Sequence, residues 1–196
     1  MLANAMVKLK DSLSCITYNG AQHTDIQIDE TDAAAKLKKI TLAAPKGDWL
    51  SFNPDDGRKC KRIHRPCNAV VMSPLLAIDG YDHHRACDCV VVVNRGGQLT
   101  VVYIDLKSGN PVGYAGQFKS TRQFVRYALG LLEEFHQEKL SIAEERYVIL
   151  YGGKAPLLNK TTTILKAEKM GKSKLDAAYK REVTNSARLY LKELLD

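Results

Sequence analysis

Three charged side chains at the ends of two apolar runs could together hydrolyse a phosphodiester bond. Asp88 opens the run CDCVVVV, and Asp105 and Lys107 close the next run along the chain. Two carboxylates can hold Mg²⁺ or Mn²⁺, because such cations accept oxygen ligands and keep bound water. The metal can lower the pKa of a bound water, and the lysine can stabilise developing charge. These residues therefore predict a metal-dependent phosphodiesterase site.

An ordinary polar strand end is the alternative interpretation of Asp105 and Lys107. Aspartate is depleted in strands, however, and Asp105 directly follows the apolar residues VVYI. A buried charge at that position needs a partner or a metal. The metal interpretation is therefore favoured.

A β-hairpin is the element that would bring these residues together. Residues 87–93 and 98–106 are rich in β-branched side chains, and Asn94-Arg95-Gly96-Gly97 lies between them. In an antiparallel hairpin the start of the first strand lies beside the end of the second, at one edge of the sheet. Both runs are apolar at nearly every position, which indicates a sheet covered on both faces.

The rest of the chain predicts one α/β domain over residues 1–196, with a mixed β-sheet flanked by helices. Amphipathic spacing predicts a long helix over residues 113–139. Ala, Leu and Lys predict a short helix over residues 33–40. Strands are expected at residues 69–72 (AVVM) and 147–151 (YVILY), and a loop at residues 43–58. Residues 183–194 could form a strand or a final helix.

The motifs in this hairpin resemble those of the PD-(D/E)xK nuclease superfamily. The series CDCVVVV, VYIDLKSG and then a helix containing AGQF carries the resemblance, over roughly residues 85–130. Asp88 matches the first acid of the pattern, Asp105 the acid of the triplet and Lys107 its lysine. Two departures are that no proline precedes Asp88 and that the triplet begins with Asp rather than the commoner Glu.

The resemblance implies a restriction-endonuclease-like core, with the motifs in about residues 85–151. It implies a nuclease acting on DNA with Mg²⁺ or Mn²⁺, similar to small nuclease domains of bacterial anti-phage defence or restriction systems. It also implies a catalytic glutamine on the following helix. Gln117 is favoured over Gln123 because it lies nearer the strand end, although either could be a solvated helix residue.

A third acid and a histidine pair are further candidates for the site. Glu30 is a candidate metal ligand from an upstream element, whereas helix capping is the favoured role of Asp32. His83 and His84 could bind metal or phosphate, but an exposed loop pair is the favoured interpretation.

Neither the cysteine and histidine residues nor a Gly-Lys-Ser sequence predicts a functional site. The spacing of Cys60, His64, Cys67, Cys87 and Cys89 is poor for a zinc site, so buried free thiols are expected. The Gly-Lys-Ser at residues 171–173 lacks the earlier glycine of a phosphate-binding loop and is rejected.

Net charge favours a polyanionic partner. The chain has 29 Lys and Arg against 22 Asp and Glu, a formal charge of +7. The candidate phosphate contacts lie in a basic cluster and in a helix stripe with four-residue spacing. They are Lys61, Arg62 and Arg65 in the cluster, and Arg122 and Arg126 in the stripe. A charged, solvated face is the alternative for both sets.

The chain is expected to be a cytoplasmic protein without membrane contact. No run of about 18 apolar residues is present, and the first residues lack a signal-peptide pattern. A chain of 196 residues has little room for target recognition, so a partner protein or a second copy is expected to supply it. The alternative functions are a catalytically silent nucleic-acid- or protein-binding module on the same fold, and a zinc-stabilised interaction module.

Overall fold

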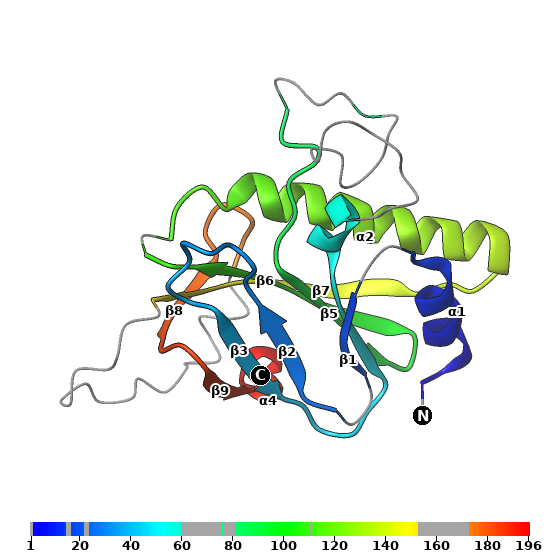
Figure 1. Ribbon diagram of the computed structural model, residues 1–196. Helices are drawn as coiled ribbons and strands as arrows, with labels where there is room; N and C mark the ends of the chain where they lie inside the picture. Colours follow the sequence, from blue (N-terminus) through cyan, green and yellow to red (C-terminus); the bar gives the residue numbers. More distant parts are fainter. Residues whose placement is uncertain are drawn as a thin grey trace.

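Two β-sheets and three α-helices make up the part of the chain that can be described. The computed structural model describes residues 2–14, 17–21, 24–59, 76, 81–109, 111–152 and 173–196. The larger sheet has six strands in the order β1-β4-β5-β6-β7-β8, and the smaller has the order β2-β3-β9 (Figure 1). The predicted mixed α/β fold is confirmed at this level.

The elements have the following bounds. The strands are β1 (Thr17–Ala21), β2 (Ile26–Asp29), β3 (Lys39–Ala43), β4 (Trp49–Asn53), β5 (Cys89–Arg95), β6 (Gln98–Lys107), β7 (Ser141–Gly152), β8 (Tyr179–Val183) and β9 (Ala187–Tyr190). The helices are α1 (Asn4–Ser12), the 3₁₀ helix η1 (Pro54–Lys59), α2 (Ala115–His136) and α4 (Leu191–Leu195).

The β5–β6 hairpin forms the centre of the larger sheet, as the sequence predicts. Cys89 pairs with Ile104 and Arg95 with Gln98 in an antiparallel ladder. Gly96 and Gly97 make the turn with φ of 65° and 88°, a conformation that glycine adopts without strain. Strand β7 then pairs in parallel with β6, so the sheet is mixed.

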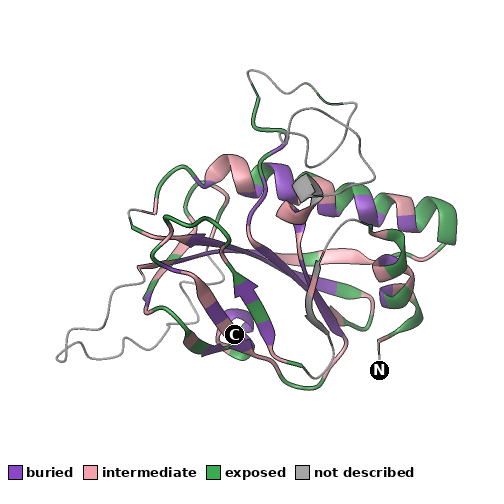
Figure 2. Ribbon diagram, in the orientation of Figure 1, coloured by how far each residue is buried: buried purple, intermediate pink, exposed green. Residues whose placement is uncertain are grey.

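Both faces of the larger sheet are covered, which the apolar runs also predict. On one face, Val90, Val101 and Tyr103 pack with residues of α1 and α2. On the other, Val91 and Ile104 pack with residues of β2, β3, β9 and α4. Figure 2 shows α2 with buried residues toward the sheet and exposed residues away from it. The end of β6 therefore lies between two packed layers.

The short helix predicted over residues 33–40 is wrong. Residues 33–34 form a turn, and β3 begins at Lys39. Ile40 and Leu42 are fully buried against β2 and β9, so the free energy of sheet burial outweighs the helix propensity of this segment.

The loop predicted over residues 43–58 is also wrong, because it contains β4 and η1. Trp49, Leu50 and Phe52 are buried in the larger sheet. The Pro, Gly and Asp residues that suggested a loop lie before and after this strand.

Other boundaries are corrected in smaller ways. Helix α2 is shorter than residues 113–139, and β7 is longer than residues 147–151. The ambiguous tail holds both kinds of element, with β9 followed directly by α4. The strand expected at residues 69–72 lies outside the described residues. Among the helices in the described ranges, none combines the length and apolar character that crossing a membrane requires.

Candidate active site

Asp88 and Asp105 lie beside each other at one end of the central hairpin. Cys89 and Ile104 are paired, so the next residues outward along the two strands are Asp88 and Asp105. Tyr103, two residues before Asp105, packs on the α2 side of the sheet, and strand alternation places Asp105 on that side too. The Asp88 carboxylate accepts a hydrogen bond from the Leu106 backbone N–H at 2.6 Å, which fixes its position.

Lys107 and Gln117 complete a connected group with Asp105. The Lys107 ammonium lies 2.8 Å from Asp105 Oδ2 and donates to Gln117 Oε1 at 2.8 Å. The Gln117 amide nitrogen donates in turn to the Ala86 carbonyl oxygen at 3.2 Å. Of the two glutamines considered from sequence, the structure brings Gln117 to the site and leaves Gln123 exposed on α2.

The surroundings of the two aspartates disfavour their ionised forms. Burial raises the pKa of Asp88 well above its usual range, and the neighbouring Asp105 charge raises it further. The hydrogen bond from the Leu106 backbone N–H lowers the pKa and so opposes this rise. Burial also raises the pKa of Asp105, although the Lys107 ammonium opposes the rise. A divalent cation at this position would stabilise both ionised forms.

The buried carboxylate of Asp105 is under-satisfied. Its side chain is fully buried, and Lys107 is the cation paired with it among the described residues. Within those residues its close polar neighbours are the Lys107 ammonium, 2.8 Å from Oδ2, and the Asp88 carboxyl, and no other group donates a hydrogen bond of good geometry to either oxygen. A buried carboxylate whose close neighbours are one ammonium and a second acid is a position where a bound cation fits.

The donor set suits a magnesium-like ion with two protein carboxylates. Within the described ranges, no group of three or more His, Cys, Asp or Glu side chains is arranged to hold a metal. Mg²⁺ is commonly held by one or two carboxylates while water and substrate oxygens fill the other positions. Asp88 and Asp105 therefore fit this ion as its protein ligands.

Glu30 lies near enough for its charge to act on the two aspartates. It raises the pKa of both Asp88 and Asp105. Its Oε1 accepts the Asp32 backbone N–H at 2.8 Å, and Asp32 accepts from Ala34 N–H at 2.9 Å, so these acids shape a turn rather than cap a helix. The role of Glu30 as a metal ligand stays a prediction.

The loop that carries Glu30 is attached to the end of β6 by Ser108. The Ser108 hydroxyl oxygen accepts the backbone N–H of Lys36 at 2.7 Å and that of Leu37 at 3.2 Å. This contact joins the upstream segment to the residue that follows Lys107. Sequence reasoning missed Ser108, because its partners lie about 70 residues away in the chain.

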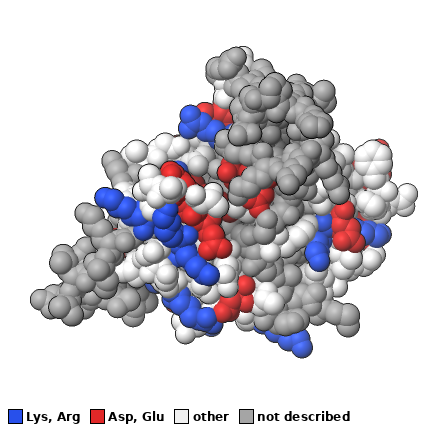
Figure 3. Space-filling view, in the orientation of Figure 1, with Lys and Arg blue, Asp and Glu red and all other residues white. Residues whose placement is uncertain are grey.

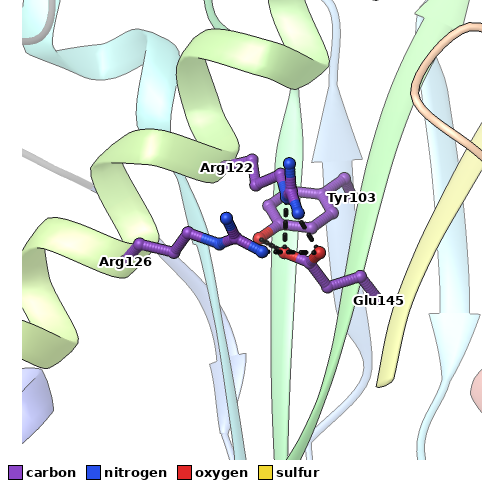
Figure 4. A network of polar contacts seen from close by, with 4 residues as sticks. All are labelled: Tyr103, Arg122, Arg126 and Glu145. Carbon is purple, nitrogen blue, oxygen red and sulfur yellow. Dashed lines mark hydrogen bonds and ion pairs between the residues drawn. The ribbon is translucent and has the colours of Figure 1, made fainter. Parts of the chain in front are cut away.

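Arg122 and Arg126, the candidate phosphate contacts on α2, share an internal partner, and their contact with phosphate stays a prediction. Arg122 Nε lies 2.8 and 3.0 Å from the two oxygens of Glu145, and Arg126 lies 3.3 Å from the same carboxylate. Tyr103 also donates to Glu145 at 3.3 Å (Figure 4). This network joins α2 to β6 and β7. Arg126 keeps 44% of its side chain exposed, whereas Arg122 keeps 24%.

The remaining candidates fall into two groups. Lys61, Arg62, Arg65, Cys60, His64 and Cys67 lie outside the described residues. Cys87 is a buried free thiol on the α2 side, as expected, and Cys89 is buried on the opposite side. His84 is buried with a ring nitrogen 3.2 Å from the Leu76 carbonyl oxygen, whereas His83 is exposed. The expectation of an exposed pair is therefore right for His83 and wrong for His84.

The charged surface is mixed in sign on the face that Figure 3 presents. Lysine and arginine side chains of the described residues form a band there, with acidic side chains beside them (Figure 3). The formal charge of +7 therefore does not produce an uninterrupted basic surface on this face.

Comparison with known proteins gives no further guide. No protein-family model matches the chain, and neither the curated proteins nor the solved structures contain a significant match.

Proposed function

We propose that this chain is a Mg²⁺- or Mn²⁺-dependent nuclease with a PD-(D/E)xK site on a restriction-endonuclease-like core. The observation that carries the proposal is the contact chain from Asp105 through Lys107 to Gln117, with Asp88 beside it. Asp105 and Lys107 from the end of β6, Gln117 from α2 and Asp88 from just before β5 are brought together around the buried Asp105 carboxylate.

Each side chain then has a distinct part in hydrolysis. Asp88 and Asp105 would hold the metal, which supplies an activated water and polarises the phosphate when bound. Lys107 places its positively charged ammonium next to the reacting phosphate and stabilises the negative charge that develops there. Gln117 orients Lys107, because its amide nitrogen is committed to Ala86 and its oxygen therefore faces the ammonium.

DNA is the proposed substrate, in a restriction or anti-phage defence setting. The excess of Lys and Arg over Asp and Glu supports a polyanion as ligand. A partner protein or a second copy of the chain would supply target recognition.

The direct test combines metal removal with Asp105→Asn. Linear and circular DNA are incubated with the protein in Mg²⁺, Mn²⁺ or EDTA, and Mn²⁺ binding is measured by calorimetry. We expect cleavage with either metal and none in EDTA. Asp105→Asn keeps the side-chain shape but removes the charge, so cleavage should fall on the order of 1,000-fold.

Lys107→Ala serves as the companion variant. It should also abolish cleavage yet retain Mn²⁺ binding, because an ammonium is not a metal ligand. Undiminished cleavage in EDTA, or by Asp105→Asn, would contradict the proposal. DNA binding without cleavage under any metal condition would instead support a silent binding module.

A further inference from the structure

Two exposed aromatic rings are stacked just before the active-site strand. Tyr81 and His83 lie with ring centroids 4.7 Å apart and planes within 9° of parallel. Tyr81 is 64% exposed, among the most exposed large side chains of the described residues. An exposed aromatic side chain held against a second ring is pre-ordered, so binding a third planar group there costs little conformational entropy.

The segment that carries this pair is fixed against the first turns of α2. The Ser120 hydroxyl donates to the His83 carbonyl oxygen at 2.5 Å. Asp82 forms an ion pair with Arg85 at 2.6 Å, and a backbone hydrogen bond between the same two residues closes a turn. A Cβ at Gly116 would collide with the Asp82 carboxylate, so the glycine allows this close approach.

The same segment leads directly into the catalytic group. Ser120 follows Gln117 by three residues, which is less than one helical turn, or about 5 Å along α2. Ala86, three residues after His83, accepts the hydrogen bond from Gln117. The stacked pair and the Lys107–Asp105 site are therefore attached to the same short stretch of α2.

We propose that Tyr81 and His83 form a stacking platform for an unpaired nucleobase next to the scissile phosphate. The inference rests on the proposed nuclease function and names its substrate class as single-stranded DNA. Each base has a flat aromatic face that stacks on an exposed ring irrespective of its identity. In a duplex those faces are covered by neighbouring base pairs, so the platform selects a strand whose bases are free.

The test measures binding to a fluorescein-labelled oligothymidylate in EDTA, where cleavage cannot interfere. Tyr81→Ala should weaken binding about tenfold, the effect of losing one base–aromatic stack. Tyr81→Phe and Tyr81→Trp keep a flat ring and should bind like the parent protein. Tyr127→Ala is the matched control, because Tyr127 is equally exposed, at 65%, on the outer part of α2.

A spectroscopic readout separates stacking from a general loss of affinity. With 2-aminopurine in the oligonucleotide, the parent protein should quench its fluorescence and Tyr81→Ala should not. The proposal is overturned if Tyr81→Ala binds as tightly as the parent, if Tyr127→Ala loses as much, or if the parent protein does not bind the oligothymidylate.

The two proposals fail in distinguishable ways. Metal-dependent cleavage of duplex DNA without any Tyr81-dependent binding would overturn the platform and leave the nuclease function standing. Tyr81-dependent binding without cleavage in Mg²⁺ or Mn²⁺ would overturn the nuclease function and leave the stacking platform standing.

Discussion

Among single residues, Gln117 connects the most parts of the site. It accepts from Lys107 and donates to the Ala86 carbonyl, so it fixes where the ammonium lies relative to Asp105. Its contribution is to position Lys107 rather than to contact the reacting phosphate. A residue of this kind should affect the rate of the chemical step more than substrate binding.

We therefore expect Gln117→Ala to lower kcat by about 10- to 100-fold with little change in KM, since a misplaced catalytic group can cost about 100-fold. Steady-state kinetics with Mn²⁺ and thermal unfolding measure the effect. Gln123→Ala, which removes an exposed glutamine from the same helix, should leave kcat, KM and the unfolding temperature unchanged. Equal effects of the two substitutions would show that Gln117 has no special role.

At the scale of secondary-structure elements, the Glu145 network joins α2 to the sheet. Arg122 and Arg126 on α2 meet Glu145 on β7, and Tyr103 on β6 donates to the same carboxylate. Glu145 and Arg122 are mostly buried, so water screens the attraction between their charges less than it would in an exposed pair.

Glu145→Gln should reduce the free energy of unfolding by about 1 kcal/mol, because a partly buried guanidinium loses its carboxylate. It should also strengthen binding to single-stranded DNA at low salt, since two arginines become available to phosphate. Urea unfolding and fluorescence binding measure both effects. Glu133→Gln is the control, because Glu133 forms an exposed pair with Lys139. Unchanged DNA affinity in Glu145→Gln would argue that these arginines are purely structural.

The elements that the sequence predicts correctly are those encoded by neighbouring residues. The β5–β6 hairpin follows from two β-branched runs and a glycine-containing turn, and Asp88, Asp105 and Lys107 follow from its ends. The helix predicted over residues 33–40 is wrong because of residues distant in the sequence. Strand β3 pairs with β9, which follows more than 140 residues later. Glu145 was missed for a similar reason, since its partners come from α2.

The stacked pair shows the same limit within the candidate site. His83 could be singled out from its type and its position before Asp88. Its backbone also accepts a hydrogen bond from Ser120 on α2, a contact across 37 residues that no local pattern encodes.

Across the whole molecule, the buried carboxylate of Asp105 links stability to pH. The pKa of Asp105 is raised above its ordinary value of 3.8, mainly by burial. The folded protein therefore holds this proton at pH values where the unfolded chain has released it. The stabilisation is complete below the unfolded pKa and is lost as pH rises through the higher folded pKa.

In metal-free buffer, the free energy of unfolding of the parent protein should therefore fall relative to that of Asp105→Asn as pH rises above about 4. One retained proton gives a slope of about 1.4 kcal/mol per pH unit within that window. Urea unfolding at a series of pH values in EDTA measures the difference. If the difference between the two proteins is flat or increases with pH, burial does not raise the pKa of Asp105 in the folded state.

The parallel pairing of β3 with β9 also bears on how the protein is made. Ile40 pairs with Ala187, and the Asn185 side-chain oxygen accepts the backbone N–H groups of Lys38 and Lys39. A ribosome synthesises the β5–β6 hairpin long before it reaches these residues. During translation, the residues of this hairpin are therefore all present while the loop bearing Glu30 still lacks its Asn185 contacts. The sheet with the order β2-β3-β9 can therefore be completed only after about residue 190 has emerged from the ribosome.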